Sequence, residues 1–254
     1  MTQAIVHSAK ITSAWQGRQA KVETSAIPQY TVQLRGVSKI YAETKFGLTD
    51  VNLNLRQGDF LFVTGPSGAG KTTLMKLVYG AETADQGEVK VAGVNVGLLK
   101  GNRLSHLRRQ LGVVFQDYKL IPRWTVAENV AFVLKSQGVP KSEIERRLLP
   151  TLKLVGLHQR ADCFPSQLSG GEQQRASIAR AIVGSPKLLL ADEPTGNLDQ
   201  DNAYQVLGIL KKLNSLGITI MITTHDMGLI EAAQAPVAHL RGGRLQILNP
   251  QQVI

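Results

Sequence analysis

The chain has 254 residues, 43% of them hydrophobic, which suits one domain or one domain with a subdomain. No apolar run is long enough to cross a bilayer, so a membrane role would require a partner protein. The net charge of +10 favours acidic partners, although the basic residues are scattered and most are expected to form a solvated surface. Cys163 is the only cysteine, and the first residues show no secretory signal, so we expect a cytoplasmic location.

The first part of the chain divides into a polar segment and the start of a folded domain. Residues 1–29 lack clear periodicity and are predicted to be a poorly ordered extension, whereas 30–254 form the folded domain. Strand-like alternation begins at Tyr30–Leu34 and continues more weakly over Leu48–Leu55. Asp59–Thr64 is a short apolar run between glycines, which is typical of a buried strand.

The rest of the chain alternates between predicted strands and helices. Thr72–Tyr79 is predicted to be a helix, and residues of about 117–179 have mainly helical character. The other predicted helices are Val126–Gln137, Lys141–Val155, Ala176–Val183, Asp201–Ser215 and one from Met227. The other predicted strands are Gly87–Val91, Gly112–Phe115, Lys187–Ala191, Thr219–Thr223, Val237–Leu240 and Arg244–Ile247. This order indicates an α/β sheet with a helical insertion.

A glycine-rich loop between the buried strand and the first helix matches the pattern G-x-x-x-x-G-K-[ST]. Its residues are Gly65, Pro66, Ser67, Gly68, Ala69, Gly70, Lys71, Thr72 and Thr73. Glycines let successive N–H groups point into one concavity, and the helix N-terminus favours an anion. We therefore predict a nucleotide phosphate site, in which Lys71 contacts the β- and γ-phosphates, Thr72 ligates Mg²⁺ and Thr73 donates to the α-phosphate. A glycine-rich turn with a chance lysine is the alternative.

Two further motifs point to nucleotide hydrolysis. Asp192 and Glu193 follow a buried strand, so their carboxylates should lie at the sheet edge beside the phosphate loop. There Asp192 would hold Mg²⁺ and Glu193 would activate water, unless the pair is only a solvated turn. Ser169, Gly170, Gly171 and Glu172 precede an apolar helical pattern and form either a capping box, a second anion site, or both.

Together, LSGGEQQR, LLLADEP and GNLD in this order resemble the ABC-type ATPases, over about residues 31–247. The resemblance implies a P-loop NTPase (RecA-like) core with an antiparallel β edge and a helical subdomain at about 117–179. It also implies that ATP and Mg²⁺ bind between two copies in a head-to-tail homodimer. Ser169–Glu172 of one copy would then face the loop Gly65–Thr73 of the other.

The same resemblance assigns roles to four isolated residues. Gln116 would reach Mg²⁺ and the attacking water, and His225 would hold the γ-phosphate and Glu193; a structural glutamine and histidine are the alternatives. Asp199, in Asn197–Asp199, would belong to the loop that crosses the dimer interface. Tyr41 would stack on adenine, although Phe46 competes for this role and Tyr41 could be an ordinary surface residue.

Within the family, the runs GPSGAGKTTLMKL, LRRQLGVVFQDYKL, FPSQLSGGEQQR and LLADEPTGNLD are similar to the subfamily of cell-division ATP-binding proteins, FtsE. That similarity implies an integral membrane subunit of the FtsX type, cell-wall hydrolysis as the regulated process, and a location at the inner face of the plasma membrane. Residues 117–129, with Pro122 and Trp124, would contact the membrane subunit or pack locally. An ABC exporter or lipoprotein-release ATPase is the alternative, and a soluble ATPase acting on nucleic acid is disfavoured by the single cassette. A module without turnover is disfavoured by Glu193 and His225.

Overall fold

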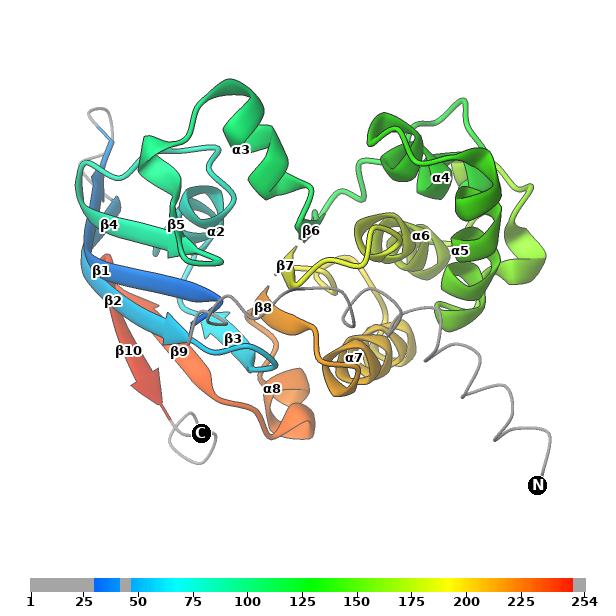
Figure 1. Ribbon diagram of the computed structural model, residues 1–254. Helices are drawn as coiled ribbons and strands as arrows, with labels where there is room; N and C mark the ends of the chain where they lie inside the picture. The colour runs from blue at the N-terminus through cyan, green and yellow to red at the C-terminus, as the bar shows by residue number, and fades with distance from the viewer. Residues whose placement is uncertain (1–29, 42–46, 249–254) are drawn as a thin grey trace.

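The computed structural model describes residues 30–41 and 47–248, and it has a lobe built on two sheets beside a helical lobe (Figure 1). The first sheet is antiparallel, with the strand order β2-β1-β4-β5. Its strands are β1 (Val32–Ile40), β2 (Gly47–Leu55), β4 (Gln86–Val91) and β5 (Val94–Asn95). Val32 lies opposite both Leu55 and Val91, so the start of β1 is the middle of this sheet.

The second sheet carries the functional loops and has the order β10-β9-β3-β8-β7-β6. Its strands are β3 (Phe60–Thr64), β6 (Leu111–Val114), β7 (Leu188–Asp192), β8 (Thr219–Thr223), β9 (Val237–Arg241) and β10 (Arg244–Leu248). All neighbours are parallel except the β9–β10 pair. Because β3 and β7 both flank β8 in parallel, the loops after these strands open at the same edge.

Helices cover the parallel sheet and form the second lobe. They are α2 (Lys71–Val78), α3 (Gly101–Arg108), α4 (Val126–Ser136), α5 (Lys141–Leu154), α6 (Gly170–Ile182), α7 (Gln200–Ser215) and α8 (Met227–Ala233). Three short 3₁₀ helices occur at Val96–Leu98, His158–Arg160 and Pro165–Gln167. None of the helices in the described ranges is long and apolar enough to span a membrane.

Alternate residues of the central strands serve two hydrophobic cores. Leu189 and Ile220 face a core shared with α4–α7, whereas Leu188 and Met221 face a core shared with β1, β2 and α2. Strands buried on both faces have continuous apolar sequences, which explains the run Leu188–Ala191. The parallel sheet is therefore held rigidly between the antiparallel sheet and the helices, and its loops have a fixed base.

The helical lobe has its own polar anchor at the start of α4. Asn129 is buried, its Oδ1 accepts from Ile121 N–H at 2.7 Å, and its Nδ2 donates to the carbonyls of Ile121, Trp124 and Thr125. Thr125 and Glu128 form a capping box that begins α4. These bonds fix the segment between the sheet and the lobe, and they show that residues 121–125 are ordered by local contacts.

The predicted P-loop NTPase fold with an antiparallel edge is confirmed, and most predicted elements lie within two residues of the observed ones. Several details were wrong, including the two-residue strand β5, which was not predicted. The strand predicted to end at Leu34 continues to Ile40, since Gly36, at φ +58°, lets β1 pass a bulge. The helix predicted from Ala176 begins at Gly170, inside the capping box. Helix α3 was not predicted, because only Leu107 of its eight residues is buried. The division at residue 30 and the limits 117–179 stay predictions.

Candidate active site

The phosphate loop has a backbone that only glycine can adopt at several positions. Gly65, Gly68 and Gly70 have φ values of +146°, +76° and +105°. A Cβ on Gly65 would lie 2.2 Å from the Leu240 carbonyl oxygen, and one on Gly70 would lie 2.7 Å from the Leu48 side chain. Gly70 is the N-cap of α2 and supplies no side-chain cap, so the first N–H groups of α2 are free to bind an anion.

Lys71 is buried and folds back over the phosphate loop. Its Nζ donates to the carbonyl oxygens of Gly65 at 2.8 Å and Pro66 at 3.3 Å. The same ammonium lies 3.7 Å from Oε1 of Glu193. The neighbouring Thr72 side chain is exposed at the start of α2, and Thr73 Oγ1 donates to the Tyr41 hydroxyl at 3.5 Å. The predicted phosphate ligands therefore surround one end of α2.

The two carboxylates at the end of β7 approach the phosphate loop, although β8 lies between β7 and β3, the strand that leads into the loop. Asp192 is the last residue of β7, and Glu193 follows it with a left-handed φ of +44°. Such a backbone costs a residue with a Cβ about 1–2 kcal/mol. The turn directs Glu193 between Lys71 and His225, whose Nδ1 lies 3.3 Å from Glu193 Oε2. The structure thus brings Lys71, Glu193 and His225 together as the sequence predicts.

Gln116 joins the same group from β6. It lies two residues beyond the end of the strand and is exposed. A methyl group built on Gly196 would lie 3.5 Å from both Gln116 Nε2 and Glu193 Oε2, so both side chains border the same glycine. Parallel strand order explains this convergence, because β6, β7 and β8 end at one edge of the sheet.

Tyr41 lies beside the phosphate loop, at the last described residue before the gap at 42–46. Its hydroxyl accepts from Thr73, and the Lys39 ammonium lies 5.7 Å from the centre of its ring. This position is compatible with the predicted contact to adenine. The competing residue, Phe46, lies outside the described residues.

The Mg²⁺ implied by the family fits the donor atoms at this edge. The candidate ligands are the Thr72 hydroxyl, the Gln116 amide oxygen and the Asp192 carboxylate, all of which are hard oxygen donors. Within the described ranges, no group of three or more His, Cys, Asp or Glu side chains could hold a metal by itself. Mg²⁺ is usually held by one or two protein ligands together with substrate phosphates and water, so this sparse donor set suits it.

The signature residues lie at the N-terminus of α6 in the other lobe (Figure 1). Ser169 and Glu172 form the predicted capping box: Ser169 N–H donates to Glu172 at 2.8 Å, and Glu172 N–H donates to Ser169 Oγ at 3.2 Å. The bond from Ser169 N–H is the main reason that the pKa of Glu172 is lowered. No hydrogen bond or ion pair joins Ser169–Glu172 to Gly65–Thr73 within the part of the chain that the structure describes.

Asp199 has a local role that the sequence analysis did not consider. It caps α7, and hydrogen bonds from the Asn202 backbone and side chain lower its pKa. The Asn202 amide oxygen in turn accepts from Arg175 Nη1 of α6 at 3.3 Å. Asp199 is therefore connected through Asn202 to the signature helix α6.

Two residues near the site were missed. Arg180 of α6 donates to the carbonyls of Tyr118 and Lys119, both of which have left-handed backbones, and burial lowers its pKa. Thr223, at the end of β8, hydrogen-bonds to both Asp192 and Glu193. Their sequence signals were weak, because Arg180 lies in a helical pattern and Thr223 is one of several threonines before His225.

With this geometry in view, the comparison with known proteins is direct. The family model for the ABC transporter matches residues 48–196. The chain belongs to the ABC transporter family. As an ATPase of this family it hydrolyses ATP, and the recognition made from LSGGEQQR, LLLADEP and GNLD is confirmed.

Among curated relatives, the chain is 42% identical to the cell division ATP-binding protein FtsE of Streptococcus pneumoniae, over 84% of this chain and 93% of the relative. FtsE of Bacillus subtilis is 41% identical over the same shares. FtsE of Escherichia coli is 42% identical, over 84% of this chain and 96% of the relative.

Solved cassettes share the fold. The dimeric ATP-binding cassette MJ0796 bound to ADP and Pi has a TM-score of 0.78 and 34% identity, over 86% of this chain and 98% of that one. CbiO1 of Clostridium perfringens, part of the ABC transporter complex CbiONQ, has a TM-score of 0.81 and 28% identity, over 89% and 90%.

Proposed function

We propose that this ABC ATPase is the ATP-hydrolysing subunit of an FtsEX-like membrane complex in cell division. The observation that carries the proposal is the approach of Glu193 to both Lys71 and His225, at 3.7 and 3.3 Å, beside an uncapped α2. The identity to FtsE proteins of three distant bacteria supports the cellular role. In this proposal, ATP binding drives dimerisation, and hydrolysis resets a membrane partner that controls cell-wall hydrolysis.

The proposed chemistry follows from the positions of the side chains. The N–H groups of Gly65–Thr73 and the Lys71 ammonium bind the phosphates and stabilise the charge that develops on the transferred group. Glu193 orients a water molecule and accepts its proton, and His225 holds Glu193 and the γ-phosphate. Gln116 positions the same water. Mg²⁺, when bound through Thr72, Gln116 and Asp192, would neutralise phosphate charge.

The dimer is proposed because the two halves of the site do not meet within one chain. Ser169–Glu172 lies in the other lobe, where Ser169 and Gly170 are exposed at the start of α6. Two solved structures of the relative MJ0796 are dimeric, one of them bound to ADP and Pi, which supports a dimer here. Each ATP would then lie between the phosphate loop of one copy and Ser169–Glu172 and Asp199 of the other.

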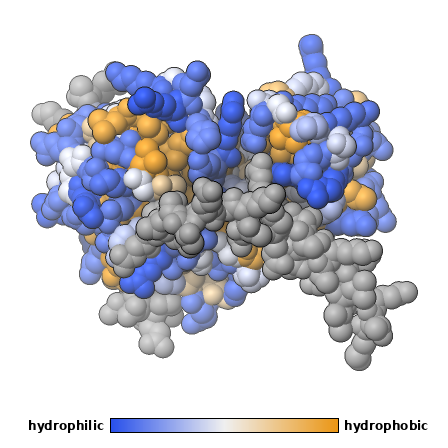
Figure 2. Space-filling view, viewed as in Figure 1, coloured by the Kyte–Doolittle hydropathy of each residue, from blue (hydrophilic) through white to orange (hydrophobic). Residues whose placement is uncertain are grey.

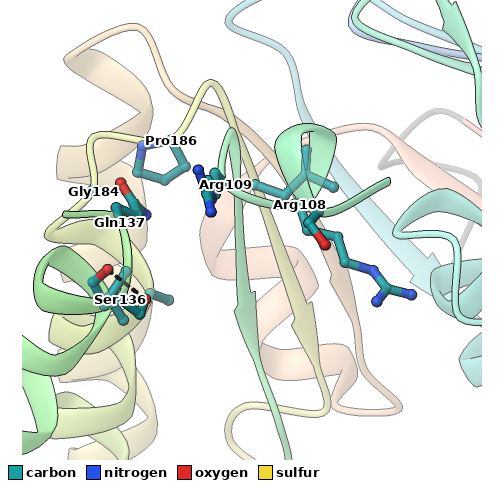
Figure 3. A pocket seen from close by; sticks show the side chains of 10 residues that line it. Arg108, Arg109, Ser136, Gln137, Gly184 and Pro186 are labelled. Carbon is teal, nitrogen blue, oxygen red and sulfur yellow. Dashed lines mark hydrogen bonds between the residues drawn. The ribbon is translucent and has the colours of Figure 1, made fainter. Parts of the chain in front are cut away.

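The membrane subunit is proposed to dock near the boundary between the lobes. A cleft of about 270 Å³ lies there, between α3 on one side and α4 and the end of α6 on the other (Figure 3). Arg109 points across this cleft toward Gln137 and Pro186, whereas Arg108 turns away and donates to the carbonyls of Tyr79 and Gly80. Among the described residues that line the cleft, Arg109 thus presents its positive charge to a mixed polar and apolar surface.

The neighbouring surface of α4 adds apolar area to this docking region. On the face shown in Figure 2, apolar residues gather in two places, in a larger patch over the two-sheet lobe and in a smaller one over the helical lobe, which contains α4. Phe132 is 43% exposed and packs edge-on against Trp124, with ring centres 5.1 Å apart. Trp124 thus takes part in local packing and also supports an exposed aromatic residue. Contact with an FtsX-like subunit at this region would hold the chain at the inner face of the membrane.

The test is co-purification of the full chain from cross-linked membranes of its own host, with identification of the bound membrane protein. We expect an FtsX-like protein, and Phe132→Asp should reduce its recovery by about tenfold or more. Leu149→Asp, on the exposed face of α5, is the matched control and should leave recovery unchanged. Recovery of an exporter or lipoprotein-release subunit would replace the cell-division proposal. Recovery of nucleic acid without a membrane protein would overturn it.

A further inference from the structure

Thr223 connects the two carboxylate residues of the site through one buried hydroxyl. It is the last residue of β8, it is fully buried, and it lies opposite Asp192 in the β7–β8 ladder. Its side chain occupies the edge of the sheet where the catalytic loops begin. Among the described residues, no hydrogen bond joins the Thr223 hydroxyl to Gly65–Thr73, and the nucleotide roles proposed above do not use it.

The hydroxyl makes two short hydrogen bonds, one as a donor and one as an acceptor. Its Oγ1 is 2.6 Å from Asp192 Oδ1, and since an ionised carboxylate can only accept, Thr223 must donate its proton there. The Glu193 N–H donates to the same Oγ1 at 2.8 Å, and also to the Thr223 carbonyl at 3.2 Å. One hydroxyl therefore uses its single proton for Asp192 and a lone pair for Glu193.

The second bond matters because Glu193 has an unfavourable backbone. At φ +44° the chain turns sharply after β7, and that turn sends the Glu193 side chain toward Lys71 and His225. A residue with a Cβ keeps this conformation only when its surroundings hold it. The Glu193 N–H faces β8, where it donates a hydrogen bond to Thr223.

We propose that Thr223 is a positioning residue for ATP hydrolysis: its hydroxyl fixes the turn that aims Glu193 and holds Oδ1 of Asp192. The inference rests on the proposed role of Glu193 as the base. Thr223 acts through these two residues. Its contribution is to geometry, and a displacement of the base by a fraction of an ångström lowers the rate of hydrolysis without weakening the binding of ATP.

The test is steady-state ATP hydrolysis by the full chain with Thr223→Val, which keeps the size and β-branching and removes the hydroxyl. We expect kcat to fall about tenfold or more while KM for ATP changes less than about twofold. Thr223→Ser restores the hydroxyl and should recover most of kcat. Unchanged kcat in Thr223→Val, or equal losses in Thr223→Val and Thr223→Ser, would overturn the proposal.

Thr219→Val is the matched control on the same strand. Thr219 is also fully buried, and its hydroxyl contacts the Thr31 hydroxyl at 3.2 Å and accepts from Gly58 N–H at 3.0 Å, far from the catalytic edge. We expect this variant to lose thermal stability and to keep its kcat. If Thr219→Val lowers kcat as much as Thr223→Val does, the effect of Thr223 is only structural and the proposal fails.

Two further variants separate the outcomes. If Thr223→Val does not fold, Thr223→Ala and Thr223→Ser can be compared instead. Both lack the methyl group and they differ only in the hydroxyl, so the ratio of their kcat values measures the contribution of the hydroxyl to hydrolysis. Glu193→Gln is measured alongside. If it is inactive and Thr223→Val is fully active, the positioning role is wrong and the proposed base stands. If Glu193→Gln is itself active, the proposed base is wrong.

Discussion

The surface around the phosphate loop and the surface around Ser169 differ in how their polar groups are satisfied. At the phosphate loop, polar side chains from three segments meet: Glu193 lies close to both Lys71 and His225, and the N–H groups at the start of α2 have no side-chain cap. At the signature, Ser169 and Glu172 cap their own helix, and Glu172 pairs with Arg160 at 3.3 Å. The surface at the phosphate loop leaves N–H groups available for a ligand, whereas the polar groups at Ser169 and Glu172 are bonded within their own surface.

This difference teaches that the two surfaces depend on a second chain to different degrees. The first already holds a cation, a carboxylate and uncapped N–H groups in one place, so we expect it to bind nucleotide in the monomer. The second has Gly170 exposed at the start of α6, and its neighbouring cations are already engaged, Arg160 by Glu172 and Arg175 by Asn202 and Gln205. We expect it to complete a site only when another chain supplies a nucleotide that is already bound.

The largest expected effect is at Glu193. Glu193→Gln keeps the shape of the side chain and removes the base, so kcat should fall by about 10²–10⁴-fold while ATP binding persists. Phosphate release and calorimetric titration with ATP measure the two quantities. Glu231→Gln, an exposed acid on α8, is the control and should hydrolyse ATP normally. Normal turnover in Glu193→Gln would show that Glu193 is not the base at the phosphate loop.

The signature surface is tested by adding bulk and charge. Ser169→Arg should weaken ATP-driven dimerisation about hundredfold or more, because a charge would be buried unpaired at the interface. Light scattering of the Glu193→Gln form with ATP measures the dimer. Ser166→Arg, on the exposed neighbouring 3₁₀ helix, is the matched control and should still dimerise. A normal dimer with Ser169→Arg would contradict the head-to-tail arrangement.

A smaller effect is expected from removing the charge of Lys71 at the phosphate loop. Lys71→Met should raise the Kd for ATP about 10–100-fold, the value of one or two hydrogen bonds from a charged donor. Lys76→Met, one turn further along α2, should bind ATP as the wild type does. Calorimetry on the monomer is sufficient, since this surface lies in one chain. Equal affinities in both variants would remove Lys71 from the phosphate site.

The smallest effect compares two caps of the same design. Ser169→Ala and Thr125→Ala each remove the side chain of a capping box, at α6 and α4 respectively, and each should cost about 1 kcal/mol of unfolding free energy. Denaturant titration measures both. Only Ser169→Ala should also lower ATPase activity, because only that cap is expected to face a nucleotide. Equal ATPase activities would mean that Ser169 serves the helix alone.

Much of this molecule could be predicted from local sequence. The phosphate loop, the acidic pair and the capping box are each specified within a few residues, and the parallel strands are continuous apolar runs. Helix α3 could not be predicted, since its periodic apolar signal is a single buried leucine. The hydrogen bonds of Thr223 and Arg180 could not be predicted either, because the partners are distant in the sequence. Asp192 lies 31 positions from Thr223, and Tyr118 lies 62 positions from Arg180.

The ion pair between Lys71 and Glu193 has a thermodynamic consequence for nucleotide binding. The Lys71 ammonium lies 3.7 Å from the Glu193 carboxylate, so it already has a counter-charge. If the γ-phosphate takes this place as proposed, we expect it to exchange with Glu193 and to bind less tightly than it would to an unpaired Lys71. The same exchange would free the Glu193 carboxylate for water when the phosphate arrives.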